Sequence, residues 1–201
     1  MRFWGVRGSL PTPGPDTAKY GGNTSCVELR AKDGAILVLD CGTGLANLGR
    51  ELVMEHQTRI GIVLSHYHMD HLFGFPYFDP FYAPNFHVNL MGPGYNGLDV
   101  QNKLGRYLNG VYHPVRLQDI TANMDFSHIK ARQKSEVNGF VVEAFPLNHP
   151  GGSMGYRIER DDRVVVYMTD TAPFASPHTG VAANKPSSWP LFDSFATNLL
   201  P

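Results

Sequence analysis

The stretch Ile60-Gly61-Ile62-Val63-Leu64-Ser65-His66-Tyr67-His68-Met69-Asp70-His71 decides the fold of this chain. Residues 60–64 form a short, unbroken apolar run rich in β-branched side chains, which predicts a strand buried on both faces. Directly after it come three histidines and an aspartate in the pattern His-x-His-x-Asp-His. A chance match to this pattern anywhere in a chain of this composition is on the order of one in a thousand. The pattern therefore indicates a functional site at the end of a buried strand rather than an ordinary surface loop.

The residue types in this loop are those that bind divalent metal ions. Imidazole nitrogen and carboxylate oxygen suit Zn²⁺, and also Mn²⁺ or Fe²⁺. In a loop that leaves a rigid strand end, His66 and His68 can point the same way, while Asp70 and His71 can turn toward a second position nearby. Four ligands within six residues are too crowded to converge on one tetrahedral ion. We therefore expect a site for two divalent metal ions, with Zn²⁺ as the leading candidate.

Two metal ions need more ligands than this loop supplies, and two further residues qualify by their position. His149 follows directly after an expected strand, and Asp170 ends another one. A carboxylate at a buried strand end has a large desolvation cost unless a cation compensates it. Taken alone, each of the two residues is also consistent with a structural role.

The remaining pattern predicts a mixed α/β chain with a single domain over residues 1–201. Its opening, rich in glycine and proline, is expected to be mostly loop, and residues 171–201 are expected to be an irregular tail. Asp33-Gly34 between two apolar runs predicts a hairpin, and leucines at helical spacing predict a helix over residues 44–56. The other expected elements are strands at 25–29, 35–39, 60–64, 88–91, 140–145, 156–159 and 164–168, and a helix at 100–108.

Composition and charge exclude several classes of protein. With 42% hydrophobic and 17% charged residues, the chain of 201 residues is typical of a globular domain and not of a disordered protein. Its formal net charge of −1 disfavours a role in coating nucleic acid, for which a basic surplus is usual, although a local basic patch stays open. The chain has no apolar run of membrane-spanning length and no signal-peptide pattern, so we expect a cytoplasmic protein. Cys26 and Cys41 are expected to be buried, reduced thiols.

Five stretches of the chain resemble motifs of the metallo-β-lactamase superfamily. They are Phe3-Trp4-Gly5-Val6-Arg7-Gly8-Ser9, Gly21-Gly22-Asn23-Thr24-Ser25, Leu39-Asp40-Cys41-Gly42-Thr43-Gly44, residues 66–79, and Asn148-His149-Pro150-Gly151-Gly152 with residues 167–170. The first two are the more discriminating, and they are similar to those of ribonuclease Z-like and cyclic-nucleotide-phosphodiesterase-like hydrolases. The resemblance implies a four-layer αββα sandwich, in which two β-sheets pack between outer helices.

The resemblance also implies roles for individual residues. Asp70 and Asp170 are expected to take part in catalysis. Asp40 would orient the metal-binding loop by hydrogen bonding, and Asn23 and Thr24 would lie near the site. The implied ligands are His66, His68 and His149 for the first ion, Asp70 and His71 for the second, and Asp170 as a bridge between them.

One part of the family pattern is missing. The family has a last metal-binding histidine in a Gly-His-Ser-like motif well after the bridging aspartate, and no such motif follows Asp170. The only later histidine is His178, which fits a surface loop better than a substitute ligand. We therefore expect the second sheet to be incomplete at its C-terminal end. A strand edge exposed in this way would allow a homo-oligomer.

The expected activity is hydrolysis of phosphodiesters through attack by a metal hydroxide. Small cyclic or linear nucleotide-type diesters are expected as substrates rather than precursor tRNA, because the net charge is near zero and no Gly/Lys-rich arm interrupts the chain. Two alternatives remain open. One is hydrolysis of thioesters, lactones or β-lactams on the same metal site, and the other is a truncated, non-catalytic metal-binding remnant.

Overall fold

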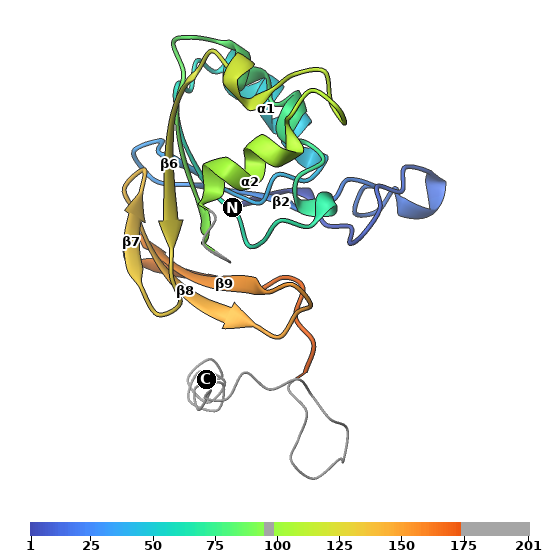
Figure 1. The fold of residues 1–201 in the computed structure, drawn as a ribbon. Coiled ribbons are helices and arrows are strands. Elements are labelled where there is room, and N and C mark those ends of the chain that lie inside the picture. Colours follow the sequence, from blue (N-terminus) through green and yellow to red (C-terminus); the bar gives the residue numbers. More distant parts are fainter. Residues whose placement is uncertain (95–98, 174–201) are drawn as a thin grey trace. The chain divides into compact units, whose positions relative to one another are not determined.

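The computed structural model describes residues 1–94 and 99–173, and residues Met1–Thr171 form one compact unit. The strands of this unit make a six-stranded sheet and a four-stranded sheet (Figure 1). The first sheet contains, in spatial order, β1 (Arg2–Gly5), β2 (Cys26–Arg30), β3 (Ile36–Leu39), β4 (Arg59–Val63), β5 (His87–Pro93) and β6 (Asn123–Ile129). The second contains β10 (Arg163–Tyr167), β9 (Ser153–Arg160), β8 (Phe140–Leu147) and β7 (Lys134–Val137). The two α-helices are α1 (Gly44–Met54) and α2 (Val100–Tyr107).

Four neighbouring strands of the first sheet, β3 to β6, run parallel, whereas β1, β2 and β3 pair antiparallel. Parallel neighbours need crossover connections. Helix α1 provides the connection from β3 to β4, and α2 lies in the connection from β5 to β6. The connection from β4 to β5 is instead a long loop with three short 3₁₀ turns, Met69–His71, Phe75–Tyr77 and Asp79–Tyr82. This loop contains the histidine motif, so the motif begins at the carboxyl end of a central parallel strand.

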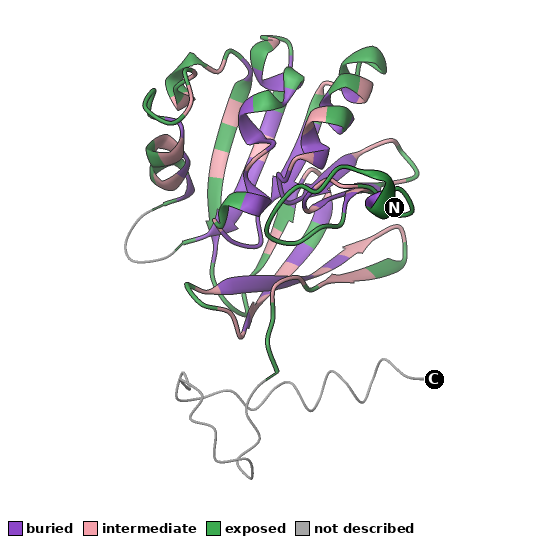
Figure 2. Cartoon of the chain, turned by 90° about the vertical axis from the view of Figure 1, so that its right-hand side faces the viewer, coloured by how far each residue is buried: buried purple, intermediate pink, exposed green. Residues whose placement is uncertain are grey.

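The apolar runs of the central strands are explained by packing on both faces of the first sheet. On β3, Ile36 and Val38 belong to a core shared with α1 and α2, while Leu37 and Leu39 belong to a core shared with the second sheet. All four side chains are fully buried, and Figure 2 shows the same burial along the neighbouring strands. The described residues therefore form three layers, helices, sheet and sheet, which confirms the expected mixed α/β class with two packed sheets. No described helix covers the other face of the second sheet.

Both expected helices are present, and each ends one or two residues before the expected boundary. Leu45, Leu48 and Leu52 of α1 are fully buried, which is the helical spacing read from the sequence. The helix stops at Met54, and His56 adopts a left-handed φ of 55°. At the start of α2 the Asp99 side chain accepts a 2.7 Å hydrogen bond from the backbone amide of Asn102. This cap satisfies one of the amide groups that a helix N-terminus leaves unpaired.

Some elements differ from the expectation. The opening was expected to be mostly loop, yet Arg2–Gly5 forms β1 because it pairs with β2, with Arg2 opposite Glu28. Strands β6 and β7 were not expected either. Strand β6 lies at the edge of its sheet and is mostly polar and exposed, so it has no apolar run to mark it. Pairing with a neighbour, rather than local composition, makes these segments strands.

Other expectations are confirmed or lie outside the described residues. Cys26 and Cys41 are free and buried. No helix of the described part of the chain is long and apolar enough to cross a membrane. From residue 174 on, the expected irregular tail, with His178, lies outside the described residues, as does any completion of the second sheet there.

Candidate metal centre

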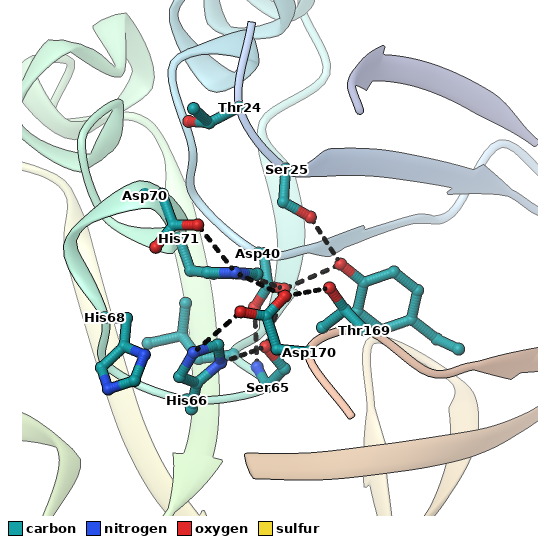
Figure 3. Close-up of polar contacts among 12 residues, drawn as sticks. Thr24, Ser25, Asp40, Ser65, His66, His68, Asp70, His71, Thr169 and Asp170 are labelled. Atoms are coloured by element: carbon teal, nitrogen blue, oxygen red, sulfur yellow. Dashed lines mark hydrogen bonds and ion pairs between the residues drawn. The ribbon is translucent and has the colours of Figure 1, made fainter. Parts of the chain in front are cut away.

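The residues of the histidine motif and two distant residues meet where strands of both sheets end. His66, His68, Asp70 and His71 follow β4, whereas His149 follows β8 and Asp170 follows β10. The carboxyl ends of parallel strands, near a change of chain direction, are a common place for ligand sites in open α/β sheets. Figure 3 shows Asp170 lying between His66 and the pair formed by Asp40 and His71. The structure thus brings together all six residues expected from the sequence.

A first group of ligand atoms comes from His66, His68, His149 and Asp170. One candidate ligand atom from each of these residues lies within 4.8 Å of the others. His149 Nε2 is 3.0 Å from His68 Nδ1, and it is 3.6 Å from Asp170 Oδ2. His66 Nε2 is 3.8 Å from the same carboxylate oxygen. Three imidazoles and a carboxylate in this arrangement are a suitable donor set for Zn²⁺.

A second group consists of Asp70, His71 and Asp170, whose ligand atoms also lie within 4.8 Å of one another. His71 Nε2 is 3.5 Å from Asp70 Oδ2 and 3.4 Å from Asp170 Oδ1. Asp170 therefore belongs to both groups, and it presents Oδ2 to the first and Oδ1 to the second. This is the position expected for a bridging carboxylate.

Two buried nitrogen atoms show that the group fits a cation. His66 Nε2 and His71 Nε2 are buried and have no hydrogen-bond partner among the described residues. A buried polar atom without a partner costs free energy, so such atoms are rare in folded proteins. Both nitrogens face the carboxylate of Asp170, at 3.8 Å for His66 and 3.4 Å for His71. Metal ions held by the two ligand groups would satisfy both nitrogens and offset the carboxylate charge.

Asp40 accepts hydrogen bonds from several residues that surround the ligand groups. Its carboxylate is fully buried and accepts hydrogen bonds from the Ser65 amide (2.7 Å), the Ser65 hydroxyl (2.8 Å) and His71 Nδ1 (2.7 Å). The Tyr167 hydroxyl donates to it as well, at 2.7 Å. A carboxylate that accepts from His71 Nδ1 fixes the ring orientation and directs Nε2 of that imidazole into the site. Four hydrogen bonds to one carboxylate therefore support the role expected for Asp40, which is to orient the metal-binding loop.

Ser65 sets the orientation of the neighbouring His66 in a similar way. The single hydroxyl proton of Ser65 is donated to Asp40, so its oxygen accepts from His66 Nδ1 at 3.0 Å. The Nε2 atom of His66 is then the unprotonated nitrogen. Burial, with the positive charge of His71, lowers the pKa of His66 to about 4, so this imidazole is neutral at pH 7 and able to bind a metal.

The electrostatic field at His71 favours a positive charge. Burial by itself would lower the pKa of His71, but the hydrogen bond to Asp40 and the negative charge of Asp40 outweigh it and raise the pKa to about 9. At Asp170, burial would raise the pKa, and the positive charge of His71 together with the Thr169 hydroxyl (2.9 Å) lowers it overall. A field that stabilises a proton at His71 also stabilises a metal cation there.

Close backbone packing holds the metal-binding loop in place. A Cβ atom on Gly42 would lie 2.5 Å from the backbone carbon of Thr24 and 2.6 Å from the backbone oxygen of Asp70. Thr24 and Thr43 exchange two hydrogen bonds of 2.9 Å, each from a backbone amide to a threonine hydroxyl, and Thr43 also donates to Asn23. Asn23 and Thr24 thus support the turn beside the site rather than enter the ligand groups.

Sequence reasoning assigned no role to three residues that contact the site. The backbone amide of Ser9 donates to Asp70 Oδ2 at 2.9 Å, which brings the N-terminal loop to the centre. The hydroxyls of Ser65 and Tyr167 both bind Asp40. Ser65 adjoins the histidine motif and Tyr167 lies three residues before Asp170, so proximity to the ligands was the available signal. Residue type could not identify the contact of Ser9, because the group that donates is a backbone amide and does not depend on the side chain.

Known proteins are similar to this chain over most of its length. A family model described as "Beta-lactamase superfamily domain" matches residues 36–194. The ribonuclease Z of Staphylococcus carnosus (strain TM300) is 27% identical over 167 residues, which cover 79% of this chain and 49% of the relative. The ribonuclease Z of Staphylococcus saprophyticus is 26% identical over 195 residues, 92% of this chain and 53% of the relative. The chain spans about half the length of the curated relatives it matches.

Solved structures show the same fold. The metallo-β-lactamase fold protein YhfI from Bacillus subtilis matches with a TM-score of 0.58 and 19% identity, covering 82% of this chain and 58% of that one. The short form of human tRNase Z matches with a TM-score of 0.55 and 20% identity, covering 84% of this chain and 68% of that one. At these identities the similarity concerns the arrangement of strands and helices.

Proposed function

Because the chain belongs to the β-lactamase superfamily, we propose that it is a metal-dependent phosphodiesterase that hydrolyses small cyclic or linear nucleotide-type diesters. The observation that supports this most directly is the position of Asp170. Its Oδ2 atom faces His66 and His149, and its Oδ1 atom faces His71. A carboxylate placed in this way would serve both ligand groups, and a pair of divalent cations held there would supply the chemistry used for in-line displacement at phosphorus.

The residues of the two groups would hold two divalent cations. His66, His68 and His149 would bind one, Asp70 and His71 the other, and Asp170 both. When bound, such a pair of ions supplies a hydroxide nucleophile near neutral pH and polarises a phosphoryl oxygen. The mixture of imidazole and carboxylate donors favours Zn²⁺, and it also suits Mn²⁺ or Fe²⁺.

The chain itself would contribute preorganisation. Ser65 and Asp40 hold His66 and His71 with Nε2 directed at the site before any ligand arrives. The Ser9 amide fixes the carboxylate of Asp70 by a hydrogen bond. Ligands held in this way need no rearrangement when the substrate binds, so binding energy is not lost to ordering them.

Cleavage of RNA is the second candidate. It is favoured by the similarity to two proteins named ribonuclease Z. The formal net charge of −1 argues for a small substrate instead, because proteins that bind many phosphates of an RNA backbone usually have a basic surplus.

A substrate panel tests the proposal. Protein loaded with Zn²⁺ or Mn²⁺ is incubated with bis-(p-nitrophenyl) phosphate, a cyclic nucleotide, a precursor tRNA transcript, a thioester, a lactone and a β-lactam. We expect hydrolysis of the diesters and its loss in His68→Ala and Asp170→Ala. His87→Ala is the matched control, since His87 is exposed at the start of β5. Turnover retained in either ligand variant, or turnover of thioesters and lactams alone, would contradict the proposal.

A further inference from the structure

The hydroxyl of Tyr167, a residue of the second sheet, contacts two residues that lie beside strands of the first sheet. Tyr167 is the last residue of β10 in the second sheet. Its hydroxyl is 2.7 Å from Asp40 Oδ2, which follows β3, and 2.8 Å from the hydroxyl of Ser25, which precedes β2. Both partners lie beside strands of the first sheet, and each is more than a hundred positions from Tyr167 in the chain.

The direction of these two hydrogen bonds follows from the groups involved. A carboxylate only accepts, so the Tyr167 hydroxyl donates its single proton to Asp40. Its oxygen then accepts the proton of Ser25. The arrangement is fully satisfied, and it provides Asp40 Oδ2 with a third donor beside the Ser65 hydroxyl and His71 Nδ1. Any change at Tyr167 therefore acts on the same oxygen that orients His71.

Tyr167 is also the last residue of a strand before Asp170. Strand β10 ends at Tyr167, and Asp170 follows three residues later with a left-handed φ of 39°. A non-glycine residue in this conformation is strained and persists only where the surrounding structure holds it. The Tyr167 hydroxyl fixes the strand end from which this segment leaves, at the point where it meets Asp40.

We propose that Tyr167 is a positioning residue of the metal centre, because its hydroxyl holds Asp40 and the strand end before Asp170 together, so that His71 and Asp170 face the same cation. The inference rests on the two-ion site of the proposed function. It assigns to Tyr167 no contact with a substrate, and it makes binding of the ion in the Asp70–His71–Asp170 group depend on one hydroxyl. Partners that orient metal ligands typically change metal affinity by about 10–100-fold when they are removed.

Two single-atom variants provide a matched comparison. Tyr167→Phe removes the hydroxyl on Asp40. Tyr156→Phe removes a buried tyrosine hydroxyl of the neighbouring strand β9, which donates to the backbone oxygen of Leu64 at 2.7 Å and not to Asp40. Both variants keep the aromatic ring, so a general loss of packing affects neither, and any cost of removing a buried hydroxyl is common to both.

Zinc binding to metal-stripped protein, measured by competition with a chromophoric chelator, is the first readout. We expect wild type and Tyr156→Phe to bind two ions alike, and Tyr167→Phe to bind the second ion about tenfold or more weakly. Equal binding of both ions by Tyr167→Phe and Tyr156→Phe would overturn the inference.

The low-field proton signal of His71 Nδ1 in metal-free protein is the second readout, assigned by its absence in His71→Gln. It reports the hydrogen bond to Asp40 directly and needs neither metal nor activity. We expect it to shift in Tyr167→Phe and to stay in place in Tyr156→Phe, whereas an unmoved signal in Tyr167→Phe would overturn the inference. If the signal moves but wild type binds fewer than two ions, the two-ion function fails while the positioning of Asp40 by Tyr167 is supported.

Discussion

The Nδ1 atom of His71 and the Oδ2 atom of Asp40 lie 2.7 Å apart, although the two residues are separated by 31 positions in the chain. Asp40 follows β3 and His71 lies in the loop after β4, and these two strands are parallel neighbours. The parallel pairing brings the ends of both strands to the same edge of the sheet. His71 Nε2 is then directed at Asp70 and Asp170, and it has no hydrogen-bond partner in the described part of the chain.

Replacing Asp40 with asparagine is expected to weaken both the fold and the metal site. The amide NH₂ group cannot accept from the donors that now surround the carboxylate, so at least one buried donor loses its partner. Such a loss costs about 1–3 kcal/mol. Thermal unfolding of metal-free protein measures the stability, and a chelator competition measures the affinity. Asp119→Asn, at an exposed ion pair with Arg116, should lower stability much less than Asp40→Asn does, because solvent screens an exposed pair. An Asp40→Asn protein as stable and as tightly metal-bound as Asp119→Asn would refute this role.

Metal content is expected to fall in a pattern that follows the two ligand groups. His149 belongs only to the first group and Asp70 only to the second, whereas Asp170 belongs to both. We therefore expect His149→Ala and Asp70→Ala each to lose one ion per chain, and Asp170→Ala to bind both ions weakly. Elemental analysis after gel filtration checks this, with His87→Ala as the control that keeps both. Loss of both ions in His149→Ala alone would show that the groups are not separable.

Substituting Gly42 with alanine is expected to destabilise the protein and displace the metal-binding loop. The new Cβ would lie 2.5 Å from the backbone of Thr24 and 2.6 Å from the backbone of Asp70, and neither backbone segment can rotate away as a flexible side chain could. Overpacking of this kind costs about 1–3 kcal/mol. Gly8→Ala is the control, because a Cβ there meets no atom of the described residues within 4 Å. Urea unfolding of both variants provides the comparison, and equal midpoints would disprove the steric role of Gly42.

The two cysteines are expected to be unreactive in the folded protein. Burial raises the pKa of both Cys26 and Cys41 well above the ordinary value, and the nearby charge of Asp40 acts in the same direction. Because the thiolate is the reactive form, a thiol reagent should react only when the chain unfolds. Labelling with and without urea measures this, and added Zn²⁺ should slow labelling further if it binds the folded state. Fast labelling of the native protein would show that this core opens locally.

Local pattern was sufficient for the central part of the fold. The apolar run before the histidine motif predicts β4, because a strand buried on both faces needs an unbroken apolar run. The leucine spacing after Gly44 predicts α1, because a helix buried on one face needs apolar residues at helical spacing. The sequences of strand β1 and edge strand β6 have no such hydrophobic pattern. Their hydrogen bonds are made by backbone groups common to every residue type, so only the presence of a neighbouring strand decides them.

The metal site likewise has residues that local pattern indicated and contacts that only the tertiary structure decided. Spacing alone indicated a metal-binding loop at His66, His68, Asp70 and His71, since four ligand-type side chains within six residues are rare by chance. His149 and Asp170 were candidates by their positions after expected strands, and the family resemblance made them expected ligands; the tertiary structure shows that they reach the loop. The contacts of Ser9 with Asp70 and of Tyr167 with Asp40 were decided by the tertiary structure alone. A hydrogen bond between residues far apart in the chain depends on how strands from two sheets are placed in space, and no local spacing encodes that placement.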